Sequence, residues 1–415
     1  MSGERGRTRI SADATGPARR YARQTILPDF GAESVDRLGS AHAAVVGAGA
    51  LGSMSSQLLA RAGVGTITLI DRDVVDWTNL QRQVLYTEAD AEAGVAKATA
   101  AAAALRAINS SIAVRAFASE AEYGSIERLL ELGESSHGVE GTESEPERGD
   151  DSIPAIESAG GVDVIVDGTD NFETRMLLND VAVKHGVPLV HGGAIGTRGM
   201  VMTVLPAGNG ERGPYAGHEG PCLRCVLGDE AGFEGVETCD TAGVLGSVTA
   251  AVASFQATET LKILLGRFEK LRRHLLVFDP WETEFARIDA GPGRQSSACA
   301  CCGDRRFEHL EGRHAREATR LCGSAEGGGA VQLRGRGAVD LSEVARRFRA
   351  AGLAGVAGNA VFVRGRVEER SAGDRKDGSG PRAVEVTVFA DGRAIFRGLN
   401  EPDRARALYA RYVSG

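Results

Sequence analysis

The stretch Ala43-Ala-Val-Val-Gly-Ala-Gly-Ala-Leu-Gly52 decides the fold of this 415-residue chain. Its first four residues are apolar and predict a buried strand. Gly47, Gly49 and Gly52 have the spacing G-x-G-x-x-G and predict a tight turn that opens a helix over Ser53–Ala62. A second apolar run, Thr66–Ile70, predicts the next strand. This strand–turn–helix–strand order is the context in which the glycine pattern indicates a nucleotide-binding fold.

The run after the second strand is more polar than a nicotinamide cofactor requires. It reads Asp71-Arg-Asp-Val-Val-Asp-Trp-Thr-Asn-Leu-Gln-Arg-Gln83. Asp71 closes the strand at the position where an acid holds a ribose hydroxyl in such folds. The further polar residues, Asp73, Asn79 and Arg82, suit a nucleotide whose phosphates are attacked. We therefore expect adenylyl transfer and consider an NAD-dependent oxidoreductase the weaker alternative.

Later segments extend an α/β fold with a doubly wound, Rossmann-like sheet. Expected strands are Ser111–Ala118, Val162–Val166, Pro188–His191, Met200–Leu205 and Leu275–Phe278, the last two able to pair antiparallel. Expected helices are Asp29–Leu38, Ala93–Asn109, Phe172–His185 and Ser247–Leu265.

Charged residues near the expected sheet edge can act on a nucleotide. A helix that starts at the glycine turn presents free N–H groups to phosphate, and Arg82 and Lys97 would add positive charge. Asp170 follows directly on a strand and can hold Mg²⁺ together with phosphate oxygens. The alternative is that Asp170 caps the helix that starts at Phe172.

Composition limits the classes of protein that fit. The net charge of −8 argues against a protein that binds nucleic acid, and no apolar run is long enough to span a membrane. Residues 1–20 are polar and predict a flexible tail without a secretory signal. Residues 133–161 are rich in Glu, Ser, Gly and Asp and predict a disordered acidic insertion. Seven cysteines, four of them in two CxxC pairs, indicate a cytoplasmic metal site in preference to disulfides.

The paired cysteines predict a structural zinc site. Its four thiolates are Cys222, Cys225, Cys299 and Cys302. Cys301 leaves the choice within the second pair open, and redox-active pairs are the alternative. Cys239 lies in a glycine-containing loop before a helix, where either a covalent or a packing role is open. Cys322 is expected to pack in a buried position.

Residues 304–415 predict a small α+β domain. Strands are expected over Ala330–Leu333 and Asn359–Val367, and a hairpin over Val384–Phe396 turns at Asp391-Gly392. Helices are expected over Leu341–Gly352 and Glu401–Tyr412. We interpret this part as a docking module for a carrier or partner, or as a structural one.

Residues 20–303 resemble the adenylyltransferases of the ThiF/MoeB/HesA type, which activate ubiquitin-like sulfur carriers and are related to ubiquitin-activating enzymes. The resemblance rests on Arg20-Tyr-Ala-Arg-Gln24, the glycine turn, the run Asp71–Gln83, Lys97, Gly168-Thr-Asp-Asn171 and the two CxxC pairs. It implies an ATP-binding adenylyltransferase domain over 21–303 that attaches AMP to the C-terminal glycine of a carrier ending in Gly-Gly and releases pyrophosphate.

The resemblance also implies roles for single residues. Asp71 would hold the ribose, with Asp73 beside it; Asn79, Arg82 and Lys97 would surround the phosphates, and Asp170 would position Mg²⁺. Arg23 would act as an arginine finger from the partner subunit of a homodimer, and Cys239 would form a thioester or acyl-disulfide in those members that use one.

The pathway stays open among molybdopterin, thiamin and tRNA thiolation. No rhodanese-type cysteine loop follows Cys302, so an external sulfurtransferase or cysteine desulfurase is the expected sulfur donor. Two alternatives to carrier activation keep the fold. One is activation of a tRNA-bound threonyl carboxylate, as in threonylcarbamoyladenosine dehydratases, and the other is a carrier-binding scaffold.

Overall fold

The computed structural model describes residues 19–132, 161–206, 220–228, 242–272, 274–289, 299–315, 317–321, 329–335, 337–368 and 383–414. These residues fall into two compact units. The first holds the described residues of 19–228 and 246–313, and the second holds those of 242–245 and 314–414. The expected tail and acidic insertion lie almost entirely outside the described residues.

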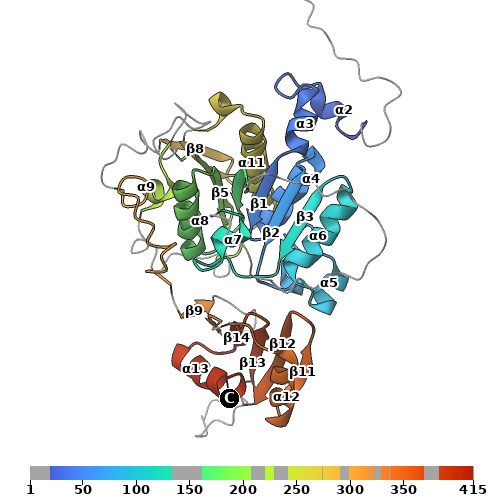
Figure 1. Cartoon of the computed structure of the whole chain (residues 1–415), viewed down its shortest axis with the longest axis vertical. Coiled ribbons are helices and arrows are strands. Elements are labelled where there is room, and N and C mark those ends of the chain that lie inside the picture. The colour runs from blue at the N-terminus through green and yellow to red at the C-terminus, as the bar shows by residue number, and fades with distance from the viewer. Residues whose placement is uncertain are drawn as a thin grey trace, which may run out of the picture. The chain divides into compact units, whose positions relative to one another are not determined.

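The first unit is built on an eight-stranded sheet with the order β3-β2-β1-β4-β5-β6-β7-β8 (Figure 1). The strands are β1 (His42–Val46), β2 (Thr66–Ile70), β3 (Ala113–Phe117), β4 (Val164–Asp167), β5 (Leu189–Ile195), β6 (Arg198–Val204), β7 (His274–Asp279) and β8 (Glu284–Asp289). Strands β1 to β5 pair parallel, and β6 to β8 pair antiparallel. The expected α/β fold with a doubly wound sheet is confirmed.

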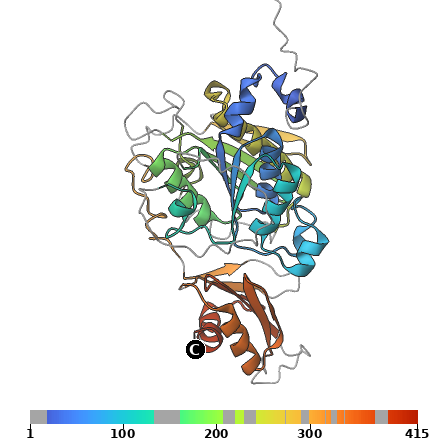
Figure 2. The same ribbon diagram turned by 45° about the vertical axis from the view of Figure 1, so that its right-hand side comes forward.

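Helices cover both faces of this sheet, as Figures 1 and 2 show. One face packs against α4 (Ala50–Ala62), α6 (Lys97–Ile108) and α11 (Gly246–Leu264). The other packs against α7 (Ile126–Leu129), α8 (Phe172–His185) and α9 (Leu223–Leu227). All residues of β1, β2 and β4 are buried, which explains why these strands are mostly apolar in the sequence.

Short elements surround the sheet. They are α2 (Ala22–Thr25), α3 (Glu33–Gly39), the 3₁₀ turns η1 (Trp77–Asn79) and η3 (Phe268–Lys270), and α5 (Glu88–Ala93). The helix expected over Ala93–Asn109 is present as α6, but its expected start is wrong, because α5 ends at Ala93 and α6 begins at Lys97. Gly94 takes a left-handed conformation with φ of +59° and ends α5 before the alanine-rich run starts.

The second unit is a six-stranded antiparallel sheet with the order β11-β12-β13-β14-β10-β9. Its strands are β9 (Ala318–Leu321), β10 (Ala330–Leu333), β11 (Ala354–Gly358), β12 (Phe362–Glu368), β13 (Ala383–Phe389) and β14 (Ala394–Arg397). Helices α12 (Leu341–Ala350) and α13 (Pro402–Tyr412) share one core with the sheet. The Asp391-Gly392 hairpin turn is confirmed, with Gly392 at φ +82°.

Candidate functional site

Two of the three glycines are required by packing at the carboxyl end of β1. Gly47 has φ of +86°, and a Cβ atom there would lie 2.7 Å from the backbone of Gly168. A Cβ atom on Gly52 would lie 1.7 Å from the carbonyl oxygen of Gly47. Both positions therefore exclude any side chain, since the turn closes on itself and on the loop after β4.

Gly49 is different, because its side-chain position is open toward the surface. A Cβ atom there would meet only the Nε2 atom of Gln83, at 3.9 Å. Gly49 is the N-cap of α4, and no side chain caps that helix. The first N–H groups of α4 are thus presented beside a position without a side chain, which is how such turns let phosphate approach the backbone.

Asp71, the acid that closes β2, holds the glycine turn in place. Its Oδ2 accepts a hydrogen bond from the Ala48 N–H at 2.7 Å, and its Oδ1 accepts one from the Asp73 N–H at 2.7 Å. Burial raises the pKa of Asp71, and Asp73 adds to this effect while Lys97 opposes it. The Tyr86 hydroxyl donates to the Ala48 carbonyl at 2.6 Å from the other side of the turn.

Lys97 joins this site from the start of α6. Its Nζ lies 3.1 Å from Asp73 Oδ2, and its N–H donates to the Asp73 carbonyl at 2.8 Å. Burial alone would lower the pKa of Lys97, but Asp73, Asp71 and Asp170 raise it. The lysine is therefore a fixed cation, and Asp170 on the loop after β4 adds to the negative charge that keeps it protonated.

Asn79 and Arg82 lie on the turn that follows β2. Asn79 is buried, and its Oδ1 accepts the Asp76 N–H at 3.0 Å, while Asp76 accepts the Thr78 N–H at 2.9 Å. The Arg82 Nη1 donates to the Thr78 carbonyl at 2.8 Å. Asn79 thus shapes η1.

Asp170 lies on the loop between β4 and α8 and is exposed. The Gly168 N–H donates to the Val46 carbonyl at 2.8 Å, which attaches this loop to the end of β1. The alternative role of Asp170 as helix cap is wrong. Asn171 is the N-cap of α8, since its Oδ1 accepts the Thr174 N–H at 2.8 Å.

Arg23 is not brought to this site within its own chain. It lies on α2, where Gln24 donates to the Ala62 carbonyl at 3.0 Å at the carboxyl end of α4. The glycine turn lies at the opposite end of this 13-residue helix, about 20 Å away at 1.5 Å per residue. The exposed Arg23 side chain therefore lies near the carboxyl end of α4, whereas the glycine turn lies at its amino end.

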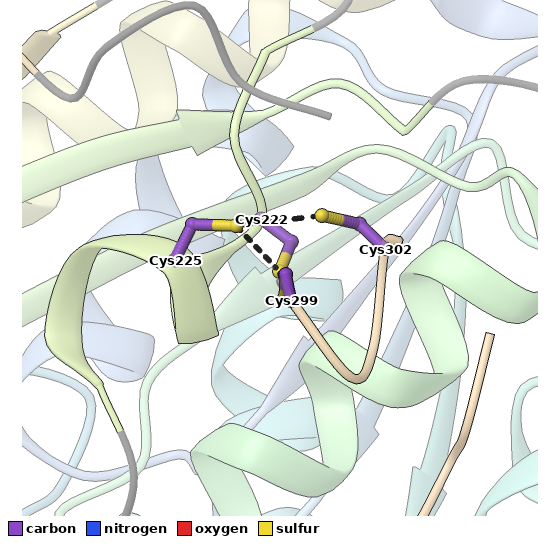
Figure 3. Close-up of side chains that lie close together, drawn as sticks. All are labelled: Cys222, Cys225, Cys299 and Cys302. Atoms are coloured by element: carbon purple, nitrogen blue, oxygen red, sulfur yellow. Dashed lines mark hydrogen bonds between the residues drawn. The ribbon is translucent and has the colours of Figure 1, made fainter. Parts of the chain in front are cut away.

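The four predicted zinc ligands converge, as Figure 3 shows. Their sulfur atoms all lie within 4.8 Å of one another. The Cys222 Sγ lies 3.7 Å from that of Cys225 and 3.6 Å from that of Cys299, and Cys225 and Cys302 are 3.4 Å apart. A tetrahedral zinc with bonds of 2.3 Å separates its sulfur ligands by about 3.8 Å. The donor set and its spacing therefore fit zinc.

Cys301 is not a member of the four-cysteine cluster, which resolves the choice within the second pair. It is fully buried, and its Sγ accepts a hydrogen bond from Asn179 Nδ2 at 3.3 Å. The Asn179 Oδ1 accepts the Leu223 N–H at 2.7 Å, so one α8 side chain holds both halves of the cluster. Cys239 and Cys322 lie outside the described residues.

Residues 21–301 match a family model described as the ThiF family. The chain is 34% identical over 396 residues to the sulfur carrier protein ThiS adenylyltransferase of Bacillus subtilis, covering 95% of this chain and 99% of that protein. It is 34% identical to the SAMP-activating enzyme E1 of Haloferax volcanii, over 73% of this chain and 94% of the other. The fold resembles a solved structure of E. coli MccB with ATP, at 20% identity and a TM-score of 0.50 over 68% of this chain and 76% of that one.

Among the residues that the structure describes, no helix is both long and apolar enough to cross a bilayer.

Proposed function

The chain belongs to the ThiF family of adenylyltransferases, and we propose that it joins AMP from ATP to the C-terminal glycine of a ubiquitin-like sulfur-carrier protein that ends in Gly-Gly. One observation carries the proposal. The uncapped amino end of α4, the buried Lys97 with its partly exposed partner Asp73, and the exposed Asp170 lie at one edge of the sheet. Such an edge presents N–H groups, a cation and a free carboxylate to a nucleotide triphosphate.

The reaction needs positioning and charge more than covalent participation of the protein. An oxygen of the carrier carboxylate forms a bond to the α-phosphorus of ATP, and the bond from that phosphorus to the bridging oxygen breaks and releases pyrophosphate. The attacking carboxylate is already ionised near neutral pH, so no general base is required. The amino end of α4, Lys97 and Arg82 would stabilise negative charge on the phosphates.

Asp71 and Asp170 have separate proposed roles. Asp71 would bind the ribose with oxygen lone pairs that its two backbone hydrogen bonds leave free, because a carboxylate offers about four acceptor sites. Asp170 would hold Mg²⁺, since an exposed carboxylate at this edge is a hard oxygen ligand. The bound Mg²⁺ would neutralise charge on the phosphate oxygens.

Arg23 is proposed to act in the site of a second copy of this chain. Its distance from its own glycine turn supports this arrangement, because the chain's own arginine starts about 20 Å away along α4. A homodimer with two complete sites is the simplest assembly that uses it.

The four-cysteine cluster is proposed to hold zinc in a structural role. The metal would join α9 to the segment around Cys299 and supply cross-linking, with no part in the chemistry at Asp170. Reduced cysteines held as a metal cluster support a cytoplasmic location. An external sulfurtransferase or cysteine desulfurase would supply sulfur to the activated carrier, and Cys239 would hold that carrier covalently only if the pathway uses such a step.

ATP–pyrophosphate exchange with purified protein and each Gly-Gly-ended carrier of the same genome tests the proposal. We expect exchange that requires one carrier and disappears in Asp170→Ala. The matched control is Asp163→Ala, which removes an exposed aspartate at the opposite end of β4 and should retain exchange. ATP binding without exchange for any carrier would contradict carrier activation and would favour the tRNA-bound carboxylate or the scaffold.

A further inference from the structure

We propose that Asp167 and His191 form a buried positioning pair that fixes the loop after β4 and so holds Asp170 over the glycine turn. The inference rests on the proposed role of Asp170. It adds two positioning residues, neither of which is exposed to the nucleotide-binding edge.

Asp167, the last residue of β4, is fully buried and determines the shape of the loop. Its Oδ1 accepts hydrogen bonds from the Thr169 N–H at 2.9 Å and from the Thr169 hydroxyl at 2.6 Å. The Arg175 Nη2 donates to the Thr169 carbonyl at 2.9 Å. The Thr169 backbone is thus held by Asp167 at its N–H group and by Arg175 at its carbonyl group, which fixes the backbone position of Asp170.

His191 holds the other oxygen of Asp167 from the neighbouring strand β5. Its Nδ1 lies 2.7 Å from Asp167 Oδ2, and both side chains are fully buried. Burial lowers the pKa of His191, against the opposing effect of the Asp167 carboxylate. Burial would raise the pKa of Asp167, but His191 and Arg175 lower it. Both directions favour a neutral imidazole that donates its Nδ1–H to an ionised carboxylate.

The loop held in this way also forms one wall of the glycine turn. A Cβ atom on Gly168 would lie 2.4 Å from the Gly47 carbonyl oxygen, so the two backbones are in direct contact. From the opposite face, Gln256 Nε2 of α11 donates to the Asp167 carbonyl at 2.7 Å. A displacement of Asp167 would therefore move Asp170 and the phosphate-binding turn relative to each other.

A purely structural role would not require a charge here. A buried ionised carboxylate carries a desolvation penalty, and well-packed apolar residues of similar size are often at least as stabilising. The carboxylate does what an apolar residue could not, because it imposes one backbone conformation on the loop through directed hydrogen bonds.

The Mg²⁺ dependence of ATP–pyrophosphate exchange tests the inference. We expect His191→Leu to raise the half-saturating Mg²⁺ concentration about tenfold or more, because lost support of a ligating carboxylate typically weakens metal affinity by 10–100-fold. The KM for the carrier should stay within about twofold, because His191 is fully buried and is not proposed to bind the carrier. His191→Asn should restore most of the affinity, because the asparagine Nδ2 can donate from the position of the histidine Nδ1.

His185→Leu is the matched control. It also removes a histidine–carboxylate contact of α8, the 2.5 Å contact between His185 and Glu127, but at the other end of the helix from Asp170. It should leave the Mg²⁺ dependence unchanged. Asp170→Ala serves as the reference, because an unchanged Mg²⁺ dependence in that variant would refute the proposed role of Asp170 itself. A normal Mg²⁺ dependence in His191→Leu, with Asp170→Ala impaired, would overturn the positioning inference alone.

A second measurement needs only the wild-type chain and the Asn variant. Long-range ¹⁵N NMR of the eight histidines reports each tautomer, and the signal missing in His191→Asn identifies His191. We expect a neutral ring protonated at Nδ1 across the pH range of activity. A ring protonated at Nε2 would overturn the proposed pair even if His191→Leu fails to fold.

Discussion

Cys225→Ser should destabilise the first unit by removing one of the four proposed zinc ligands, and the size of the effect follows from the length of chain that the cluster closes into a loop. Cys222 and Cys299 are 77 positions apart, as are Cys225 and Cys302. A cross-link across a loop of that length reduces the entropy of the unfolded chain by an amount worth about 4.5 kcal/mol. For a unit of this size, that corresponds to a decrease of roughly 10 °C or more in Tm.

The assay combines metal analysis with thermal unfolding. Wild-type protein should contain one zinc per chain, and Cys225→Ser should lose it together with the expected decrease in Tm. Cys301→Ser is the matched control, since Cys301 lies next to a ligand but outside the four-sulfur cluster. It should retain zinc, with a smaller loss of stability of about 1 kcal/mol from the hydrogen bond that Asn179 donates to its sulfur.

Two results would refute this reasoning. Full zinc content in Cys225→Ser would show that the spacing of the four sulfur atoms does not identify the zinc ligands. Loss of zinc in Cys301→Ser to the same extent would show that Cys301 replaces Cys302 as a ligand, against the spacing of the sulfur atoms.

Three further predictions concern the nucleotide edge and one surface cluster. Gly52→Ala should abolish ATP binding, measured by calorimetry, and destabilise the fold by about 3 kcal/mol or more, since its Cβ would lie 1.7 Å from a carbonyl oxygen. Gly39→Ala is the control and should have neither effect, because a Cβ atom there would meet nothing within 4 Å. Mixing inactive Arg23→Ala with inactive Asp170→Ala should restore about a quarter of wild-type exchange, because random re-pairing of a dimer with shared sites leaves that fraction complete; no recovery after confirmed subunit exchange would argue against action in trans. Burial would raise the pKa of Glu127, but hydrogen bonds from Lys184 and His185 lower it below 4.5. The ionised Glu127 should therefore stabilise the folded protein above that pH, and this stabilisation should disappear as the pH falls through the folded-state pKa. The Tm difference between wild type and Glu127→Gln should correspond to about 0.5 kcal/mol at pH 7 and vanish in acid.

Local sequence patterns predicted the centre of the first unit well. Thr66–Ile70 and Phe172–His185 have the expected bounds. Gly65 directly precedes the strand, and Gly186 ends the helix in a left-handed conformation. Strand β8 was missed because all its residues are exposed at the sheet edge, so it has no buried face to produce an apolar alternation. Strand β11 was missed for a similar reason, since it consists of glycine, alanine and one valine.

The sequence singled out the candidate site residues but not their contacts. Motif spacing pointed to Asp71, Lys97 and Asp170, and both aspartates raise the pKa of the Lys97 ammonium. Spacing could not identify Asn179, which contacts Cys301 across 122 positions, or His191, whose partner Asp167 is 24 positions away on another strand. Contacts of this kind depend on tertiary packing and leave no local pattern. The remaining signal was weak, namely a charged residue at the end of the apolar run Val164–Asp167.

The two strands that flank β1 share one arrangement, a buried aspartate that fixes the turn after the strand. Strands β2 and β4 pair with β1, and each leads to a buried aspartate. Asp71 directly follows β2, and Asp167 is the last residue of β4. Each carboxylate accepts the N–H group two residues later, Asp73 at 2.7 Å and Thr169 at 2.9 Å. Each uses its second oxygen to hold a neighbouring element, the glycine turn for Asp71 and β5 for Asp167. Because the next acids in the chain, Asp73 and Asp170, follow directly from these turns, the two flanking strands set the positions of both the lysine partner and the proposed Mg²⁺ ligand relative to the glycine turn. A nucleotide edge built in this way depends on the backbone conformation at the two strand ends, which is why substitutions of buried Asp167 or His191 should affect Mg²⁺ binding without contacting it.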